Sequence, residues 1–376
     1  MRRKRANSEA DVSAGAVAAE ALHGEFPEMK LPIQPPYAPM EAKLVSEMPK
    51  GGGWQYEPKW DGFRCLAFRD GDTVAMQSKS GQPLGRYFPE LMHALAALPV
   101  RRFALDGEIV IFEQGRLAFD ELLQRIHPAA SRIRKLSVET PGTLLVFDLL
   151  VDARGKLLTQ EPLSSRRERL EQFFEAFGAE KSRSIRLSPA STELRTATRW
   201  MEKLAGEGLE GIVAKKLELR YESGERAMLK VKQIRTADCV VGGFRMTTKG
   251  GGVGSLLLGL YGDDGKLHHV GFTSSFNTEQ RVKLIKILEP YRGGAGFSGN
   301  APGGPSRWST ERSGEWEPLD PKLVCEVRFD HFSGGRFRHG TKFLRWRPEK
   351  QPKACRFDQV VHPSGVGGAV ERLLAA

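Results

Sequence analysis

Cysteine and long apolar runs are scarce in this sequence of 376 residues, and each scarcity excludes a class of protein. The separations of the four cysteines fit neither a metal-ligand spacing nor a disulfide framework: Cys65, Cys239, Cys325 and Cys355. We expect each to be a small buried side chain in a protein of the reducing cytoplasm. The longest apolar run, 143–151, is far shorter than the roughly 20 residues that a helix needs to cross a bilayer, so no membrane location is expected.

Acidic residues are too few to balance the basic ones. The sequence has 57 Lys and Arg against 46 Asp and Glu, which gives a formal net charge of +11. Such a surplus in a soluble protein indicates a polyanionic partner, most often a nucleic acid. Charge alone leaves open the alternative of a basic cytosolic protein without such a partner.

The N-terminal segment lacks the apolar core of a signal peptide. It begins with basic residues, but Glu9, Asp11 and Glu20 interrupt the weakly apolar stretch that follows. We therefore expect a mobile tail over 1–29, with Met29 as a candidate for the true start.

The first two thirds of the chain mix strand and helix patterns. The alternating segments 62–68 and 73–80 flank an Asp-Gly turn at 69–72, which predicts a hairpin. The helix expected at 162–177 has serines at its start that predict a cap. Because strands and helices do not alternate strictly, the class is α+β. Further strands are predicted at 103–112, 143–151, 209–219 and 227–234, and further helices at 87–98, 119–126 and 197–208.

The pattern changes near residue 235, where we place a domain boundary. Short strand-like runs separated by Gly-rich turns, with one helix at 278–288, are typical of a small β-barrel. The low-complexity segment 292–314 is expected to be a flexible loop. The predicted strands of this part are 237–246, 255–262, 267–276, 322–330 and 342–348.

Several charged residues lie on or beside apolar strands, where an unpaired charge is costly. Lys230 and Lys232 are two residues apart, so both project from one face of a strand. Three lysines and two glutamates placed in this way indicate a polyphosphate pocket with a metal. The charged set is Lys59 and Asp61 in "KWDG", Glu108 in "LDGEIVIF", Asp148 in "LLVFDLL", Glu210 in "LEGIVAKK", and Lys230 and Lys232 in "MLKVKQ".

Lys59 is the candidate nucleophile of this set. A lysine amine attacks only when it is neutral, and nearby cations and desolvation favour the neutral form. Lys230, Lys232 and a divalent metal would supply that field, and they would also hold the phosphates of a nucleotide. The carboxylates of Glu108 and Glu210 are hard ligands that suit Mg²⁺. The alternative for Lys59 alone is an exposed residue beside a turn.

The order of the motifs carries more information than any one of them. "KWDGFR", "SKSG", "DGEIVIF", "VFDLL", "EGIVAKK", "LKVK" and "RWRPEK" follow one another along the chain. Together they resemble the covalent nucleotidyltransferase superfamily of ATP-dependent DNA ligases and mRNA capping enzymes, and most closely the bacterial DNA ligase C group. The resemblance implies an ATP-grasp-like nucleotidyltransferase (adenylation) domain of mixed sheets and helices at 30–235. It also implies an OB-fold β-barrel in a second domain at 236–376.

The resemblance implies roles for the residues that hold the nucleotide and the metal. Lys59 would attack the α-phosphate of ATP and carry AMP as a phosphoramidate. Glu108 would bind the ribose, Phe147 would stack on adenine and Glu57 would read the adenine amine. Glu210 would hold the catalytic Mg²⁺ or Mn²⁺, with Glu108 as its second carboxylate.

Basic residues would handle the phosphates. Lys230 and Lys232 are implied to grip the α-phosphate and the nick phosphate as catalytic partners of Lys59, and Arg64 and Lys79 to contact phosphates as well. Lys79 departs from the family's usual arginine, which keeps the charge but loses the bidentate fork. In the terminal motif Arg347 and Lys350 would contact the β- and γ-phosphates, and Glu349 stands there in place of the usual aspartate.

The function implied is nick sealing in double-stranded DNA through a lysyl-AMP and a DNA-adenylate. Implied partners are nicked DNA and DNA repair or end-joining proteins, and the protein is expected to be a cytoplasmic, nucleoid-associated monomer. One alternative is an RNA ligase or a capping-type nucleotidyltransferase. Another is a catalytically inactive module that binds DNA ends.

Four features can be explained by structure as well as by function. Phe147 also fits a core position, and Asp148 a purely structural pair. The adjacent His268 and His269 leave a strand on opposite faces, which makes them a poor metal pair. The segment 331–356 has eight basic residues with interleaved aromatics, so it fits either a phosphate-tracking face or a solvated edge strand.

Overall fold

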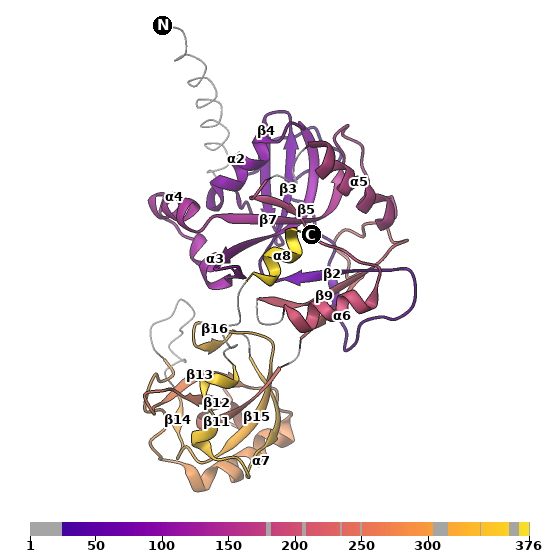
Figure 1. The fold of residues 1–376 in the computed structure, drawn as a ribbon. Helices are drawn as coiled ribbons and strands as arrows, with labels where there is room; N and C mark the ends of the chain where they lie inside the picture. The colour runs from indigo at the N-terminus through magenta and orange to yellow at the C-terminus, as the bar shows by residue number, and fades with distance from the viewer. Residues whose placement is uncertain are drawn as a thin grey trace. The chain divides into compact units, whose positions relative to one another are not determined.

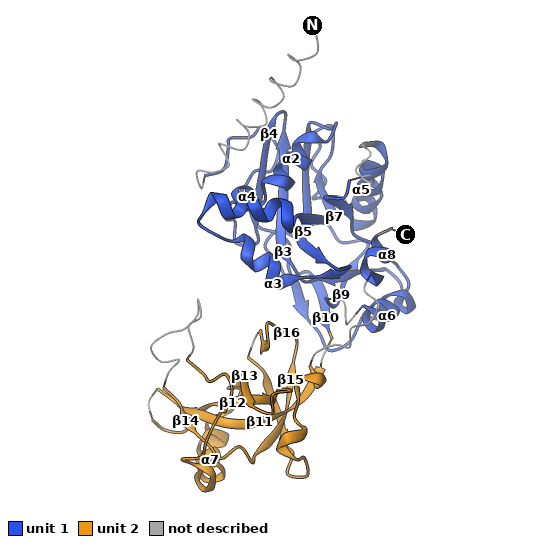
Figure 2. Cartoon of the chain, turned by 60° about the vertical axis from the view of Figure 1, so that its left-hand side comes forward, with its two compact units in different colours: residues 1–232, 366–376 blue, residues 233–365 orange. Residues whose placement is uncertain are grey.

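The chain forms two compact units in a computed structural model. Unit 1 comprises residues 1–232 and 366–376, and unit 2 comprises residues 233–365 (Figure 2). Each unit has its own hydrophobic core. The structure describes residues 25–177, 182–204, 208–233, 235–248, 250–303, 315–338, 340–360 and 368–375 (Figure 1).

Unit 1 is built on two sheets. The larger has the order β4-β3-β5-β7-β8, with β6 paired to β5, and the smaller has the order β1-β10-β9-β2. The larger sheet consists of β3 (Phe63–Asp70), β4 (Thr73–Ser78), β5 (Arg102–Glu113), β6 (Arg116–Leu117), β7 (Gly142–Val151) and β8 (Ile185–Leu187). The smaller consists of β1 (Ala42–Leu44), β2 (Trp54–Trp60), β9 (Leu209–Lys216) and β10 (Met228–Lys232).

Both faces of the larger sheet are buried, because side chains alternate across each strand. On β3, Cys65 packs in the core beneath helices α2 and α5, whereas Leu66 packs in a second cluster on the other face. That second cluster includes Met29 and Tyr221, which lie far apart in the sequence. The helices of unit 1 are α2 (Pro89–Ala97), α3 (Phe119–Arg125), α4 (Ala130–Glu139), α5 (Leu163–Phe177), α6 (Leu194–Lys203) and α8 (Ala369–Ala375), with a 3₁₀ turn η1 (Gly85–Tyr87).

Unit 2 has one antiparallel sheet of order β13-β12-β11-β15-β18, with β14 paired to β11. A hydrogen-bonded capping box of Asn277 and Gln280 begins its helix α7. Its strands are β11 (Arg235–Met246), β12 (Val253–Tyr261), β13 (Leu267–Thr273), β14 (Glu317–Pro318), β15 (Val324–Phe329) and β18 (Lys342–Trp346), beside a small ribbon of β16 (Phe332–Ser333) and β17 (Arg336–Phe337). Its helical segments are α7 (Thr278–Leu288), η4 (Glu289–Tyr291), η6 (Pro352–Ala354) and η7 (Phe357–Gln359).

The edge strands of this sheet meet at one bridged pair, Thr273 with Thr341. The Thr273 hydroxyl donates to the Thr341 carbonyl at 2.9 Å and accepts from the Phe343 amide at 3.0 Å. The sheet of the predicted β-barrel is not closed by a continuous ladder in the described residues, because a single bridge joins β13 to the residue before β18.

The C-terminal helix corrects the predicted extent of the second domain. Helix α8 was expected to belong to 236–376, but it lies with unit 1 (Figure 1). Val370 is fully buried there in a cluster with Tyr56 and Leu209, and the Gly368 amide donates to a unit 1 carbonyl at 3.2 Å. Ala369, Leu373 and Leu374 of this short helix pack against the same cluster.

Several local predictions differ from the structure. Helix α4 was not predicted, and Lys59 lies inside β2, which does not support the alternative of an exposed residue beside a turn. Helix α5 begins at Leu163, so Ser164 and Ser165 lie in its first turn and do not precede it as caps. Helix α6 begins and ends earlier than 197–208.

Two predicted mobile segments extend beyond the described residues. Residues 1–24 of the tail lie outside them, whereas Met29 is 3% exposed and packs in a core cluster. Of the loop 292–314, residues 292–303 contain no helix or strand and 304–314 lie outside the described part.

The cysteines and the apolar segments agree with the expectations from sequence. All four cysteines are buried and free, including Cys239 and Cys325, which face each other across β11 and β15. Among the helices in the described ranges, none is both long and apolar enough to cross a membrane.

Candidate active site

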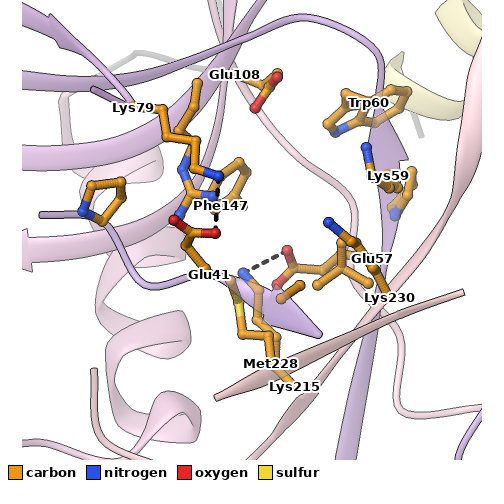
Figure 3. A pocket seen from close by; sticks show the side chains of 15 residues that line it. Glu41, Glu57, Lys59, Trp60, Lys79, Glu108, Phe147, Lys215, Met228 and Lys230 are labelled. Atoms are coloured by element: carbon orange, nitrogen blue, oxygen red, sulfur yellow. Dashed lines mark hydrogen bonds and ion pairs between the residues drawn. The ribbon is translucent and has the colours of Figure 1, made fainter. Parts of the chain in front are cut away.

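A solvent-open cavity of about 180 Å³ in unit 1 is lined from both sheets (Figure 3). It brings together residues that are separated by up to about half of the chain. The predicted site residues on its wall are Glu57, Lys59, Arg64, Lys79, Glu108, Phe147 and Lys230.

Strand register places two lysines of the smaller sheet opposite one glycine. Lys59 on β2 is opposite Gly211 on β9, and Lys232 on β10 is opposite the same residue. A Cβ on Gly211 would lie 2.0 Å from the Val231 carbonyl oxygen, so no side chain fits between the strands. The glycine of "EGIVAKK" therefore lets the three strands approach.

The glycine of "KWDG" is also required by a close approach of strands. A Cβ on Gly62 would lie 2.3 Å from the Ile109 carbonyl oxygen and 2.8 Å from the Glu108 side chain. Glycine is required because β5 of the larger sheet passes against the end of β2, which brings Lys59 and Glu108 to one cavity.

The amine of Lys59 forms an ion pair with the Glu210 carboxylate. The Lys232 amine lies 3.8 Å from the same carboxylate, which is only 9% exposed. Glu210 and Lys232 thus join the site through Lys59, although they do not line the cavity wall. Burial lowers the pKa of Lys230, and the charges of Lys59 and Lys232 add to that effect.

A second ion pair lies deeper in the cavity. The Lys215 amine is 2.7 Å from Glu57, and the Gln55 amide donates to the other oxygen of that carboxylate at 2.7 Å. Lys215 also lies 4.5 Å from the centre of the Phe147 ring. Sequence analysis missed Lys215, although it stands in "EGIVAKK" on the same strand face as Gly211.

Phe147 belongs to the cavity wall and to none of the core clusters of the described residues. The Arg64 guanidinium lies 4.8 Å from its ring centre. Its neighbour Asp148 points the other way, is 2% exposed, and forms a bidentate pair with Arg166 at 2.8 and 3.0 Å. The structural interpretation of Asp148 is therefore the one that the structure supports.

Arg64 is anchored by a carboxylate that sequence analysis missed. Its Nε and Nη2 donate to the two oxygens of Asp106 at 2.6 Å each. Asp106 is fully buried and lies two residues before Glu108, hence on the same face of β5. This pair raises the pKa of Arg64 against the opposing effect of burial. The signal was present in the sequence as the aspartate of "LDGE".

Glu108 faces the cavity and forms no ion pair with the residues that the structure describes. Burial raises its pKa to about 7, and the positive charges of Arg64 and Lys59 oppose that rise. A carboxyl group with such a pKa changes charge near neutral pH, which is typical of functional sites.

Lys79 lies at the mouth of the cavity and is 59% exposed. It forms an ion pair of 2.9 Å with Glu41, another residue that sequence analysis missed (Figure 3). This contact is the main cause that lowers the pKa of Glu41. Both residues line the cavity, which makes its mouth polar.

Arg347 and Lys350 lie in unit 2, where they share one acid. The Arg347 Nη1 donates to Asp238 at 2.8 Å, and the Lys350 amine lies 3.4 Å from the same carboxylate. Glu349, the departure from the family motif, accepts from Arg347 Nε. The two predicted phosphate ligands are thus brought together on the surface of unit 2.

The basic segment 331–356 is both an edge and a packing element. Its strand β18 lies at the edge of the sheet, but Phe337 is buried in the core of unit 2 and Phe343 packs on Trp346 at 5.2 Å. The aromatics therefore serve the core. The exposed basic side chains, such as Arg345, provide the charge of this face.

The carboxylate side chains near the cavity are the candidate ligands for a metal ion. No group of three or more His, Cys, Asp and Glu within the described ranges is arranged to hold a metal ion. Mg²⁺ needs fewer protein ligands, because it is usually held by one or two carboxylates with substrate phosphates and water. Glu108, on the cavity wall, is a carboxylate of this kind, and Glu210 is a second one that is paired with Lys59 and Lys232. His268 pairs with Asp264.

Two family models match the chain. The ATP dependent DNA ligase domain matches residues 39–232, and the ATP dependent DNA ligase C terminal region matches residues 249–350. The chain belongs to the ATP-dependent DNA ligase family. The first match contains the whole cavity wall.

Curated relatives narrow the assignment to the bacterial ligase C type. DNA ligase C1 of Mycolicibacterium smegmatis is 46% identical over 345 residues, which cover 89% of this chain and 97% of that protein. DNA ligase C of Mycobacterium tuberculosis is 41% identical, with 89% and 96% covered. A solved Lig E DNA ligase, 17% identical over 82% of this chain and 99% of its own, has a TM-score of 0.52 and shares the fold. The protein is a DNA ligase that uses ATP.

Proposed function

We propose that Lys59 carries AMP in a three-step reaction that seals nicks in double-stranded DNA. In the first step its Nζ attacks the α-phosphorus of ATP, an N–P bond forms, and pyrophosphate leaves. The observation that carries this proposal is the Lys59 amine on the cavity wall, in contact with Glu210 and close enough to Lys230 for its charge to act there. The Glu210 carboxylate is in position to accept the proton that the ammonium loses.

The nucleotide would enter between the two sheets. We assign the adenine to the region of Phe147 and Glu57, where a carboxylate can accept from the adenine amine. Glu108 then faces the ribose. Lys230 and Arg64 face the phosphates, whose negative charge they would stabilise as the α-phosphorus is attacked.

Mg²⁺ or Mn²⁺ is proposed at Glu210, with Glu108 as the second carboxylate. When bound, the metal supplies positive charge that offsets the charge of the phosphates. Arg347 and Lys350 are proposed to contact the β- and γ-phosphates in the first step. We propose that unit 2 is an OB-fold, on the basis of its five-strand antiparallel sheet.

The second and third steps act on DNA. The nick 5′-phosphate attacks the phosphorus of the Lys59 adduct, the N–P bond breaks, and a DNA-adenylate forms. The 3′-hydroxyl then attacks the 5′-phosphate, and AMP leaves. Lys232 and Lys79 are proposed as further phosphate contacts. We place the enzyme as a monomer at the bacterial nucleoid, in the cytoplasm, where it would act in DNA repair with repair or end-joining proteins.

The decisive measurement is the intact mass of the protein after incubation with ATP and Mg²⁺. We expect a gain of one AMP that is lost in acid and absent in Lys59→Ala, after treatment of all samples with pyrophosphate to remove adenylate already present. Lys50→Ala, an exposed lysine before the same strand, is the matched control. Absence of any gain in the pretreated wild-type protein would refute the proposal.

Nick substrates with RNA on one side separate a DNA ligase from an RNA ligase. Labelled GTP in place of ATP tests the capping-type alternative. The expected result is adenylation by ATP and sealing of the all-DNA nick.

A further inference from the structure

One buried hydroxyl links the two sheets behind the cavity. Tyr221 lies between β9 and β10, is 4% exposed, and packs in the cluster that also holds Met40. Its hydroxyl donates to Asp106 Oδ2 at 2.7 Å and accepts from the Met40 amide at 2.9 Å. Burial and the Asp106 charge raise the pKa of Tyr221 well above its ordinary value, so the hydroxyl keeps its proton and remains a donor.

These bonds close a ring that includes Arg64. Arg64 Nη2 donates to the same Asp106 oxygen at 2.6 Å and to the Met40 carbonyl at 3.1 Å. Both backbone groups of Met40 are therefore held, one by Tyr221 and one by Arg64. A buried polar ring of this kind is rigid as long as every member is satisfied.

The ring connects elements of the two sheets that line the cavity. Arg64 and Asp106 are on β3 and β5 of the larger sheet. Met40 leads through Glu41 into β1 of the smaller sheet, and the Glu41 carbonyl accepts from the Met228 amide of β10 at 3.1 Å. The Tyr221 hydroxyl thus fixes one sheet against the other at the floor of the site.

We propose that Tyr221 is a positioning residue for the ligase reaction, which holds the Asp106–Arg64 pair and so aims the guanidinium into the cavity. Arg64 Nη1 takes no part in the ring, and it is the nitrogen that a substrate phosphate would contact. The inference rests on the proposed phosphate role of Arg64. Tyr221 itself touches no substrate.

The test removes one oxygen. Tyr221→Phe keeps the packing of the aromatic side chain and deletes its hydrogen bonds to Asp106 and Met40. We expect the rate of nick sealing by pre-adenylated enzyme to fall about tenfold and the rate of adenylation to fall as well, because Arg64 is proposed to face the phosphates in both reactions. The KM for ATP should change less than twofold, because the adenine contacts lie elsewhere. Tyr37→Phe is the matched control, since Tyr37 stacks on Tyr221 at 6.4 Å but its hydroxyl makes no bond in the described contacts.

A double-mutant cycle separates positioning from general loss of structure. If Tyr221 acts through Arg64, then Tyr221→Phe costs little further rate in an Arg64→Lys background. Equal loss in both backgrounds, or unchanged sealing by Tyr221→Phe, would overturn the inference while adenylation of Lys59 still stands. Wild-type protein that gains no AMP would instead remove the proposed function.

Discussion

At the scale of single residues, the cavity holds most of its charges in pairs. Lys215 and Glu57 are 4% and 3% exposed, and Arg64 is tied to a fully buried Asp106. Removing one member of a buried pair leaves an uncompensated charge, which is far more costly than losing an exposed ion pair. Glu108 differs, because burial disfavours its charged form.

The Glu108 carboxyl gives a pH-dependent prediction for stability. Its folded pKa, about 7, is above the ordinary 4.5, so its contribution to stability is full below about pH 4.5 and is lost as the pH rises through 7. In EDTA without nucleotide, we expect Glu108→Gln to raise Tm by about 2–6 °C at pH 8 and to have little effect at pH 5. Thermal scans at both pH values measure this.

The matched control is Glu113→Gln, at the exposed end of the same strand. It should leave Tm unchanged at both pH values. A Glu108→Gln protein with equal Tm shifts at pH 5 and pH 8 would contradict the assignment, since only the charged carboxylate is disfavoured. The same substitution is expected to impair adenylation, so stability and activity would move in opposite directions.

At the scale of elements, close strand approach determines the site. The strands β2, β9 and β10 meet at Gly211, and β5 passes against Gly62. These glycines stand in motifs that also contain Glu210 and Lys59. Each of these two motifs therefore determines the packing of the backbone as well as the chemistry of the site.

Gly211→Ala tests this packing. Because the new Cβ would lie 2.0 Å from the Val231 carbonyl oxygen, the β9–β10 ladder must separate, and we expect a loss of about 3–5 kcal/mol in the free energy of unfolding. Urea titration measures it. Gly52→Ala, where no atom lies within 4 Å of the added Cβ, should change stability by less than about 1 kcal/mol.

Helix α8 is the element whose stability depends most on its neighbours. A helix of seven residues is marginal by itself, so the burial of Val370 must maintain it. We expect Val370→Asp to abolish amide-exchange protection of 369–375 while the strands of unit 2 keep theirs. Glu371→Gln on the exposed side is the control, and undiminished protection in Val370→Asp would contradict the role of this contact.

At the scale of the whole molecule, the chain leaves unit 1 for unit 2 and returns to unit 1 at α8. Unit 2 carries Arg347 and Lys350, and unit 1 carries the cavity. The basic surplus of +11 is spread over a protein whose substrate is a polyanion.

The surplus charge predicts a strong salt dependence for DNA binding. Each phosphate neutralised releases condensed counterions, so raising the salt from 50 to 200 mM should weaken binding to a nicked duplex at least tenfold. Adenylation by ATP should change far less. Fluorescence anisotropy with nicked and intact duplexes measures the first, and intact mass the second; a salt-independent Kd would contradict a phosphate-based interface.

The sequence by itself determined the family, and it predicted seven of the fifteen residues on the cavity wall, with Lys59 among them. Lys59, Glu108 and Lys230 were identifiable because charges on apolar strands stand out and the motifs keep their order. Tertiary structure alone decided the rest. Asp106, Lys215 and Tyr221 act through contacts with residues far along the chain, for which a single sequence gives no distance. The return of α8 to unit 1 was equally hidden, since a segment of seven residues does not reveal the surface that buries it.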